Sequence, residues 1–94
     1  MKLAEWRKEI DAIDEEIVHL INRRARAVLA VGRIKAQANL PVVDLDRERE
    51  ILQNVTRASA GFLQEDSLAR IFRHIIQESR ELQNQTEVLS RGIY

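Results

Sequence analysis

The hydrophobic positions of the chain begin with one long series at helical spacing. From Leu3 to about Ala38, neither proline nor an Asn-Gly pair interrupts apolar side chains that recur mostly every three or four residues. The series consists of Leu3, Trp6, Ile10, Ile13, Ile17, Leu20, Val28, Val31 and Ile34. Such spacing places them on one face of an α-helix. We therefore expect a single long helix that ends before Asn39-Leu40-Pro41, because proline cannot continue a helix.

Two further apolar stretches predict a short helix and a second long one. Asp44 places an acidic side chain at the start of a helix that runs to about Ser59, and we expect Gly61 to end it as a C-terminal cap. The acidic pair Glu65-Asp66 then opens a third helix that reaches about Leu89. Its apolar positions again keep helical spacing: Leu68, Ile71, Phe72, Ile75, Ile76 and Leu82.

These stretches predict an all-α fold, with residues 1–94 forming one domain of three helices in the order long, short, long. About 35 residues in the first helix span about 52 Å. A compact domain of this length has a radius of gyration of about 12 Å. One chain cannot cover the apolar face of so long a helix. We therefore predict an intertwined homodimer in which the long helices of both subunits lie side by side.

Composition narrows the class of protein further. The chain has 15 basic and 15 acidic residues, so it lacks the positive field that nucleic-acid or anionic-membrane binding uses. The absence of cysteine disfavours disulfide scaffolds and zinc ribbons. Charges among the first eight residues disfavour a signal peptide, and no apolar run is long enough to span a bilayer. We expect a cytoplasmic protein that binds neither nucleic acid nor membrane.

Cationic side chains interrupt the apolar face of the first helix. Arg24 lies between Leu20 and Val28 in the series, and Lys35 follows Val31 by one step. Eleven residues separate the two cations, which places them within about 20° of the same face and about 16 Å apart along the axis. A small anion fits that gap. Alternatively, each cation extends to the surface of the bundle or pairs with a buried glutamate.

Arg7 lies at the edge of the same face, one turn before Ile10. Seventeen residues separate it from Arg24, or about 25 Å along one helix. No small ligand can contact both arginines of one chain. In an antiparallel dimer, however, Arg7 of the partner subunit comes alongside Arg24, and the site would be shared between subunits.

The second and third helices carry further polar candidates. Asp44, Arg47 and Glu48 lie at the start of the second helix, and Ser79 and Gln83 share one face of the third at a spacing of four residues. Each group has an ordinary alternative. Asp44 is a common helix-start residue, the next two can form a solvated charge run, and the Ser-Gln pair can be plain surface.

Other kinds of site are disfavoured. Glu16 and His19 match one ligand pair of the di-iron bundles, but these need a second pair, and His74 has no glutamate three residues before it. There is no cysteine nucleophile, glycine-rich phosphate loop or triad motif. A DNA-binding helix-turn-helix is disfavoured because the chain lacks a basic recognition helix. We expect no metal and no cofactor.

Five segments taken together resemble the AroQ-type chorismate mutases, which are all-helical (type II). These segments are Trp6–Asp14, Asn22–Ala25, Val31–Lys35, Pro41–Glu50 and Ile75–Ser79. The cations of the first helix, the Asp-x-Asp-Arg-Glu-Arg start of the second and the late Ser-x-x-x-Gln pair occur in the family's order and spacing. The resemblance covers nearly the whole chain. It implies three-helix protomers, an intertwined homodimer, and cofactor-free conversion of chorismate to prephenate on the branch toward phenylalanine and tyrosine.

The resemblance also implies a role for each candidate residue. Arg24 and the partner subunit's Arg7 would hold the two substrate carboxylates, while Lys35 would reach a carboxylate and the ether oxygen. Gln83 would donate a hydrogen bond to that same oxygen, and Glu48 would accept a hydrogen bond from the substrate hydroxyl. The polar wall would be completed by Asp44, Arg47 and Ser79. Catalysis would then depend mainly on Lys35, Gln83, Arg24 and Glu48.

Arg80 departs from the pattern, since some members of the family have an apolar residue there. We expect it to affect only the packing beside the site. Two other functions are alternatives. Isochorismate-pyruvate lyases share the fold and a similar cationic site, but the presence of both Glu48 and Gln83 favours the mutase. The chain could also be a mutase-like regulatory module of a larger shikimate-pathway enzyme.

Overall fold

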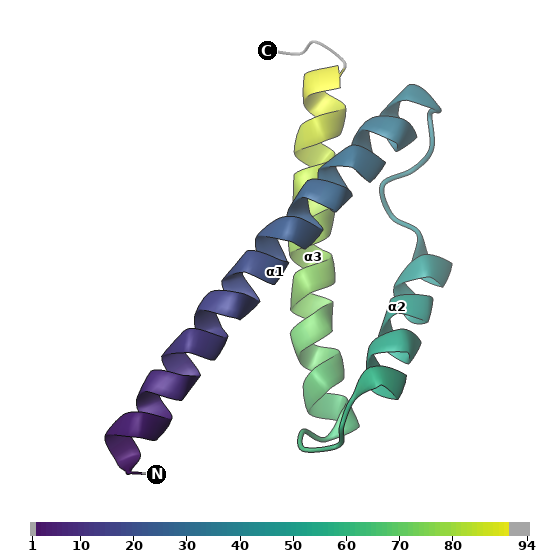
Figure 1. The fold of residues 1–94 in the computed structure, drawn as a ribbon. Helices are drawn as coiled ribbons and strands as arrows, with labels where there is room; N and C mark the ends of the chain where they lie inside the picture. Colours follow the sequence, from purple (N-terminus) through teal and green to yellow (C-terminus); the bar gives the residue numbers. More distant parts are fainter. Residues whose placement is uncertain (1, 91–94) are drawn as a thin grey trace.

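The computed structural model describes residues 2–90, with the side chains of residues 2–85. The chain forms three α-helices, α1 (Leu3–Gln37), α2 (Leu45–Ala58) and α3 (Glu65–Ser90), and no strand occurs among the described residues (Figure 1). The predicted fold class and the order long, short, long are confirmed. Within the described residues no helix is both long and apolar enough to cross a membrane.

The C-terminal end of α1 reverses the chain in a Schellman motif. Asn39 adopts the left-handed conformation, with a φ of 55°. Its N–H donates to the carbonyl of Ala36 at 3.4 Å. The N–H of Leu40 donates to the carbonyl of Lys35 at 2.8 Å. These bonds satisfy carbonyls that the helix leaves unpaired, and the reversal brings the carbonyl of Val42 within 2.9 Å of the Lys35 ammonium.

The two ends of α2 are capped differently. At the start, the Asp44 carboxylate accepts a hydrogen bond from the Arg47 N–H at 3.0 Å, as expected of an N-cap. At the end, Ser59 is the capping residue. Gly61, with a φ of 88°, lies in the following loop, where its N–H donates to Ser59 Oγ at 3.1 Å. The prediction that Gly61 caps α2 is wrong, because the extended backbone of Ser59 ends the helix first.

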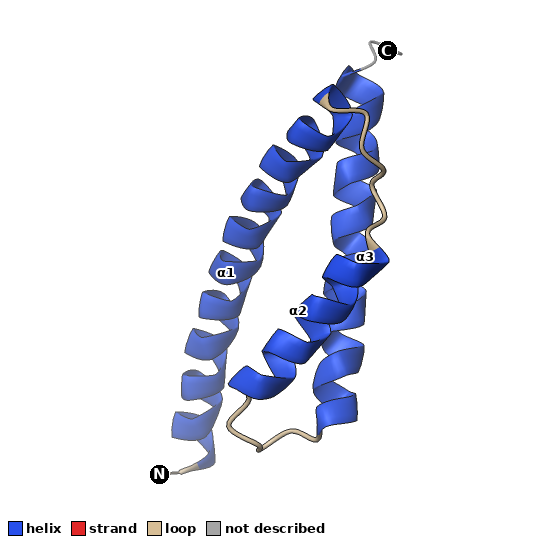
Figure 2. Cartoon of the chain, turned by 90° about the vertical axis from the view of Figure 1, so that its right-hand side faces the viewer, coloured by secondary structure: helices blue, strands red, loops and turns tan. Residues whose placement is uncertain are grey.

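Helix α3 is the element against which the other two pack. α1 crosses α3 with its C-terminal half, and α2 lies along the N-terminal half of α3 (Figures 1 and 2). Among the described residues, the buried side chains are the apolar Ile76 and the polar Gln83, at 7% and 8% exposure. Both belong to α3. The best-covered part of the chain is therefore the region where α3 meets its neighbours, and a polar group lies within it.

The N-terminal half of α1 diverges from α3 (Figure 1). The chain measures 54 × 27 × 14 Å and has a radius of gyration of 16.6 Å. This exceeds the value of about 12 Å for a compact domain of its length. Trp6 is 52% exposed, and its apolar neighbours on the helix are exposed as well: Leu3, Ile10, Ile13, Ile17 and Leu20. A single chain therefore leaves most of the apolar face of α1 uncovered, which is the premise of the dimer prediction.

Candidate active site

A cavity of about 400 Å³ lies where the three helices meet the segment that connects α1 to α2. This volume falls in the range typical of small-molecule sites. Seven of the eight predicted site residues line it: Arg24, Lys35, Asp44, Arg47, Glu48, Ser79 and Gln83. Apolar side chains complete the wall, among them Val28, Val31, Ile51 and Ile76. The structure thus brings together residues from all three helices that the sequence separates by up to 59 positions.

Arg24 reaches from α1 to α3. Its Nη1 donates to Ser79 Oγ at 2.5 Å, and that hydroxyl in turn donates to the carbonyl of Ile75 at 2.8 Å. Burial lowers the pKa of Arg24 from its ordinary value, and repulsion from the nearby Arg47 lowers it further. Among the described residues no carboxylate forms an ion pair with Arg24. The opposite charge of a bound anion would offset both the cost of burying Arg24 and its repulsion from Arg47.

Lys35 is held by two neutral oxygens. Its ammonium donates to the Val42 carbonyl at 2.9 Å and to Gln83 Oε1 at 3.0 Å. An ammonium has three donors, so one remains for a ligand. Because the Gln83 oxygen is engaged, the amide nitrogen of the same side chain is left to donate at the cavity wall. The pair thus combines a positive charge with a neutral donor.

Arg47 and Asp44 lie at the outer edge of the cavity. The Arg47 guanidinium forms an ion pair with Glu50 at the exposed surface of α2. Asp44 serves as the N-cap of the helix and also lines the cavity. The ordinary interpretation of Asp44 as a helix-start residue is therefore correct, and it is compatible with a place in the site.

Glu48 is bound by an arginine that the sequence analysis placed outside the site. Arg80 lines the cavity, and its Nε and Nη2 donate to the two carboxylate oxygens of Glu48 at 2.8 and 2.5 Å. These hydrogen bonds raise the pKa of Arg80 against the opposing effect of burial, and the charge of Glu48 adds to the rise. The expectation that Arg80 affects only neighbouring packing is wrong. Its position one residue after Ser79 on a site-facing helix was the available signal.

Arg7 is the one predicted site residue that this chain does not bring to the cavity. It is exposed near the free end of α1, seventeen residues or about 25 Å along the helix from Arg24. The structure of one chain agrees with the expectation that no small ligand can contact both arginines. That the partner's Arg7 supplies the missing cation stays a prediction.

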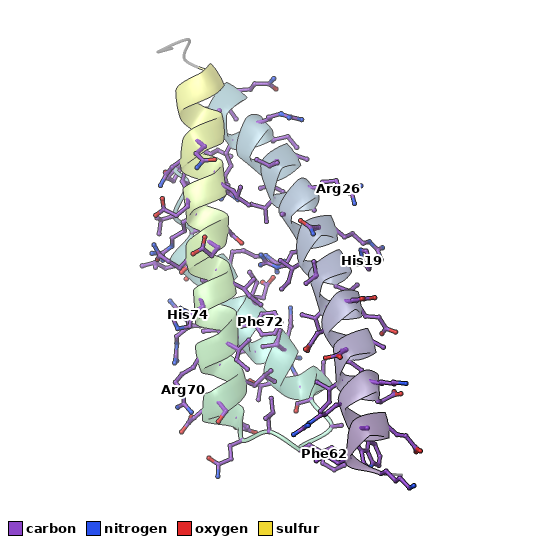
Figure 3. All side chains as sticks on the ribbon, turned by 90° about the vertical axis from the view of Figure 1, so that its left-hand side faces the viewer. His19, Arg26, Phe62, Arg70, Phe72 and His74 are labelled. Carbon is purple, nitrogen blue, oxygen red and sulfur yellow. The ribbon has the colours of Figure 1, made fainter. Side chains whose placement is uncertain are left out.

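The histidines considered as metal ligands lie apart from the cavity. Figure 3 shows His19 on the side of α1 that faces away from α3, and His74 on the side of α3 opposite Phe72. The described part of the chain contains no group of three or more His, Asp or Glu side chains placed to hold a metal ion.

The charges of the wall favour a small dianion. Four cations line the cavity, Arg24, Lys35, Arg47 and Arg80, against the carboxylates of Asp44 and Glu48, which leaves a formal charge of +2. With fixed donors in a partly desolvated cavity, such a site can bind two carboxylates and stabilise negative charge that develops between them.

Comparison with known proteins agrees with this chemistry. Residues 6–84 match the family described as chorismate mutase type II. The bifunctional chorismate mutase/prephenate dehydratase of Aquifex aeolicus (strain VF5) is 40% identical over 95 residues, which span 97% of this chain and 26% of that protein. The chorismate mutase of Methanocaldococcus jannaschii is 34% identical over 85 residues, which span 89% of this chain and 86% of the relative.

The fold is similar to that of a solved chorismate mutase. The structure of the Thermus thermophilus protein in its form II superposes with a TM-score of 0.86 at 30% sequence identity, covering 89% of this chain and 96% of that one. The chain therefore corresponds to nearly all of the Thermus thermophilus chain and to about a quarter of the bifunctional Aquifex aeolicus protein.

Proposed function

This chain belongs to the type II chorismate mutase family, and we propose on that ground that it converts chorismate to prephenate. The reaction is a [3,3] rearrangement in which a C–O bond breaks while a C–C bond forms. It transfers no proton, forms no covalent intermediate with the protein and uses no cofactor. Negative charge grows on the ether oxygen as the C–O bond breaks. The protein must therefore hold a flexible dianion in a compact geometry and stabilise that oxygen.

The contact between Lys35 and Gln83 is the observation that carries the proposal. The two side chains meet at 3.0 Å on the cavity wall, and Gln83 is only 8% exposed. We assign the ammonium of Lys35 and the amide nitrogen of Gln83 to the ether oxygen. Since neither residue is paired with a carboxylate in the described part of the chain, both donors are available to the charge that develops there.

The remaining groups bind and orient the substrate in this proposal. Arg24, set by its hydrogen bond to Ser79, takes one substrate carboxylate. Glu48 accepts a hydrogen bond from the substrate hydroxyl, and Asp44 and Arg47 complete the polar lining of the cavity. These assignments rest on the shared cavity and on the chemistry of each group.

We further propose that the active form is a homodimer with two equivalent sites. The exposed apolar face of α1 needs a covering surface, and a second copy of the same helix supplies one of matching length. In that arrangement the partner's Arg7 reaches the cavity and takes the second substrate carboxylate. Two sites, each built from both subunits, then follow from the symmetry.

A turnover assay tests the proposed activity. Purified protein is incubated with chorismate, and prephenate is quantified by product analysis. We expect saturable turnover that Lys35→Met lowers about a hundredfold or more, because a donor to the reacting oxygen is lost. Lys2→Met, at the exposed residue before α1, is the matched control and should keep parent activity.

The same assay with isochorismate separates the mutase from a lyase. Release of pyruvate from isochorismate without prephenate formation from chorismate would overturn the proposed reaction. Equal activity of Lys35→Met and the parent would leave the reaction in place but remove Lys35 from the reacting oxygen.

A further inference from the structure

Arg80 and Glu48 form a two-point ion pair within the cavity wall. They lie on different helices, α3 and α2, and both guanidinium contacts are short, at 2.8 Å from Nε and 2.5 Å from Nη2. The side chains are partly shielded from solvent, at 31% and 19% exposure. Two parallel hydrogen bonds fix the plane of the carboxylate as well as its position.

The pairing leaves Glu48 able to accept another hydrogen bond. A carboxylate offers about four lone-pair sites, and the Arg80 fork uses one on each oxygen. The remaining lone pairs lie in the plane of the carboxylate, and the contact with Arg80 fixes the orientation of that plane. Glu48 therefore presents an acceptor in a defined direction, whereas an unpaired glutamate would have rotational freedom about its side-chain bonds.

Charge gives the pair a second role. A bare carboxylate in the wall would repel a dianionic substrate, and repulsion is stronger where solvent is partly excluded. The guanidinium of Arg80 offsets the Glu48 charge through direct contact within the cavity wall. The similar pair of Arg47 with Glu50 lies at 56% and 59% side-chain exposure, where solvent already screens the charges.

We propose that Arg80 is a positioning residue, which fixes the Glu48 carboxylate as the acceptor for the substrate hydroxyl and cancels its repulsion of the dianion. The inference rests on the proposed mutase function. Arg80 acts through Glu48 and makes no contact of its own with the reacting atoms. The arginine at this place therefore governs how well the protein binds a dianion that carries a correctly placed hydroxyl.

This role predicts an effect on KM rather than on kcat. The hydroxyl contact and the charge balance are present in the ground state and in the transition state, so losing them weakens binding of both. A general loosening of the cavity would instead displace Lys35 and Gln83 from the reacting oxygen and lower kcat. A change in KM at nearly constant kcat thus indicates that Arg80 positions Glu48, whereas a lower kcat indicates a merely structural contribution of Arg80.

A double-mutant cycle tests the inference. The four proteins are the parent, Arg80→Met, Glu48→Gln and the double variant, each assayed for kcat and KM with chorismate. We expect Arg80→Met to raise KM about tenfold or more with kcat within about threefold of the parent. In the Glu48→Gln background, which carries no carboxylate to orient or neutralise, the same change should have an effect of less than about threefold.

Two further variants keep the test decisive. Arg73→Met removes an exposed cation of α3 outside the cavity and should behave as the parent. Arg80→Lys keeps the charge but not the two-point contact, so it should recover part of the KM loss. If Arg80→Met does not fold, as judged by circular dichroism, Arg80→Lys is compared with the parent in both backgrounds, where its KM increase should depend on Glu48 in the same way.

The outcomes distinguish this inference from the proposed function. An equal loss in both Glu48 backgrounds, no loss at all, or a loss confined to kcat would overturn the positioning role while the parent remained a mutase. A folded parent without prephenate formation would overturn the proposed function, and this inference with it.

Discussion

The groups that hold Lys35 explain how a lysine can face a buried amide without an ion pair to a carboxylate of the described residues. Its ammonium is held by the Val42 carbonyl and by Gln83 Oε1, at 2.9 and 3.0 Å. Neutral oxygens anchor the charge without cancelling it. A carboxylate in either place would hold the ammonium more tightly but would repel the oxygen on which negative charge grows. The neutrality of Gln83 is therefore part of the proposed mechanism.

Gln83→Glu tests this by exchanging the amide for a carboxyl of nearly the same shape. At neutral pH an ionised carboxylate would repel the charge on the ether oxygen, so we expect kcat/KM to fall about a hundredfold. A protonated carboxylic acid can donate, and activity should recover as the pH falls. Burial at this position raises the pKa of the new carboxyl, whereas the Lys35 ammonium lowers it. The measurement is kcat/KM of variant and parent across pH.

Gln85→Glu provides the matched control for that profile. It makes the same substitution two residues further along α3 at an exposed position. Its profile should follow the parent. If Gln83→Glu also followed the parent at every pH, the assignment of Gln83 to the reacting oxygen would be wrong.

At the residue scale, sequence reasoning identified most of the polar side chains that line the cavity, but not how they pair with one another. Arg24 and Lys35 were predictable because helical spacing placed two cations on one apolar face. The contact of Arg80 with Glu48 joins residues 32 positions apart on separate helices. It depends on the angle and register at which α2 packs against α3, and no local pattern specifies these.

At the scale of the elements, Asp44 has two roles that can be separated. Its carboxylate caps α2 by accepting the Arg47 N–H, and the residue also lines the cavity. Asp44→Ala removes the cap and should lower the free energy of unfolding by about 1 kcal/mol. Asp44→Asn keeps an acceptor for that N–H and should stay near parent stability. Urea unfolding of the three proteins at one protein concentration measures the difference.

Activity of the same two variants reports on the charge of Asp44. If only the cap matters, kcat/KM of Asp44→Asn will equal that of the parent. A loss in Asp44→Asn at unchanged stability would assign the negative charge to the site. A stable Asp44→Ala protein, with unfolding unchanged, would contradict the capping role.

The helices themselves were predictable because their causes are local. Apolar spacing determines which segments become helical, and the turn before Pro41 ends α1 where the sequence indicates. Gly61 was misjudged for an equally local reason. A glycine with positive φ is common just beyond a helix, but Ser59 had already left helical geometry, so the glycine serves the loop.

At the scale of the whole molecule, a single chain leaves much of its apolar surface exposed to solvent. Figure 1 shows the N-terminal half of α1 diverging from α3, and its large apolar side chains are exposed. Phe62, in the loop between α2 and α3, is fully exposed as well. Exposed apolar surface of this extent is typical of an interface. The sequence indicated the need for a covering partner through helix length alone, whereas the geometry of a dimer depends on contacts between chains.

A site shared between subunits predicts that two inactive variants complement each other when they form a heterodimer. Arg7→Ala and Arg24→Ala should each lower kcat/KM at least about a hundredfold, because each removes a cation that binds a substrate carboxylate. When the two variants are unfolded together and refolded, a heterodimer contains one site with both arginines and one site with neither. Random pairing then restores roughly a quarter of the parent activity. Size exclusion with light scattering, and mass spectrometry of the mixture, establish that heterodimers form. Heterodimers without recovered activity would place Arg7 outside the site, and a stable folded monomer would contradict the dimer itself.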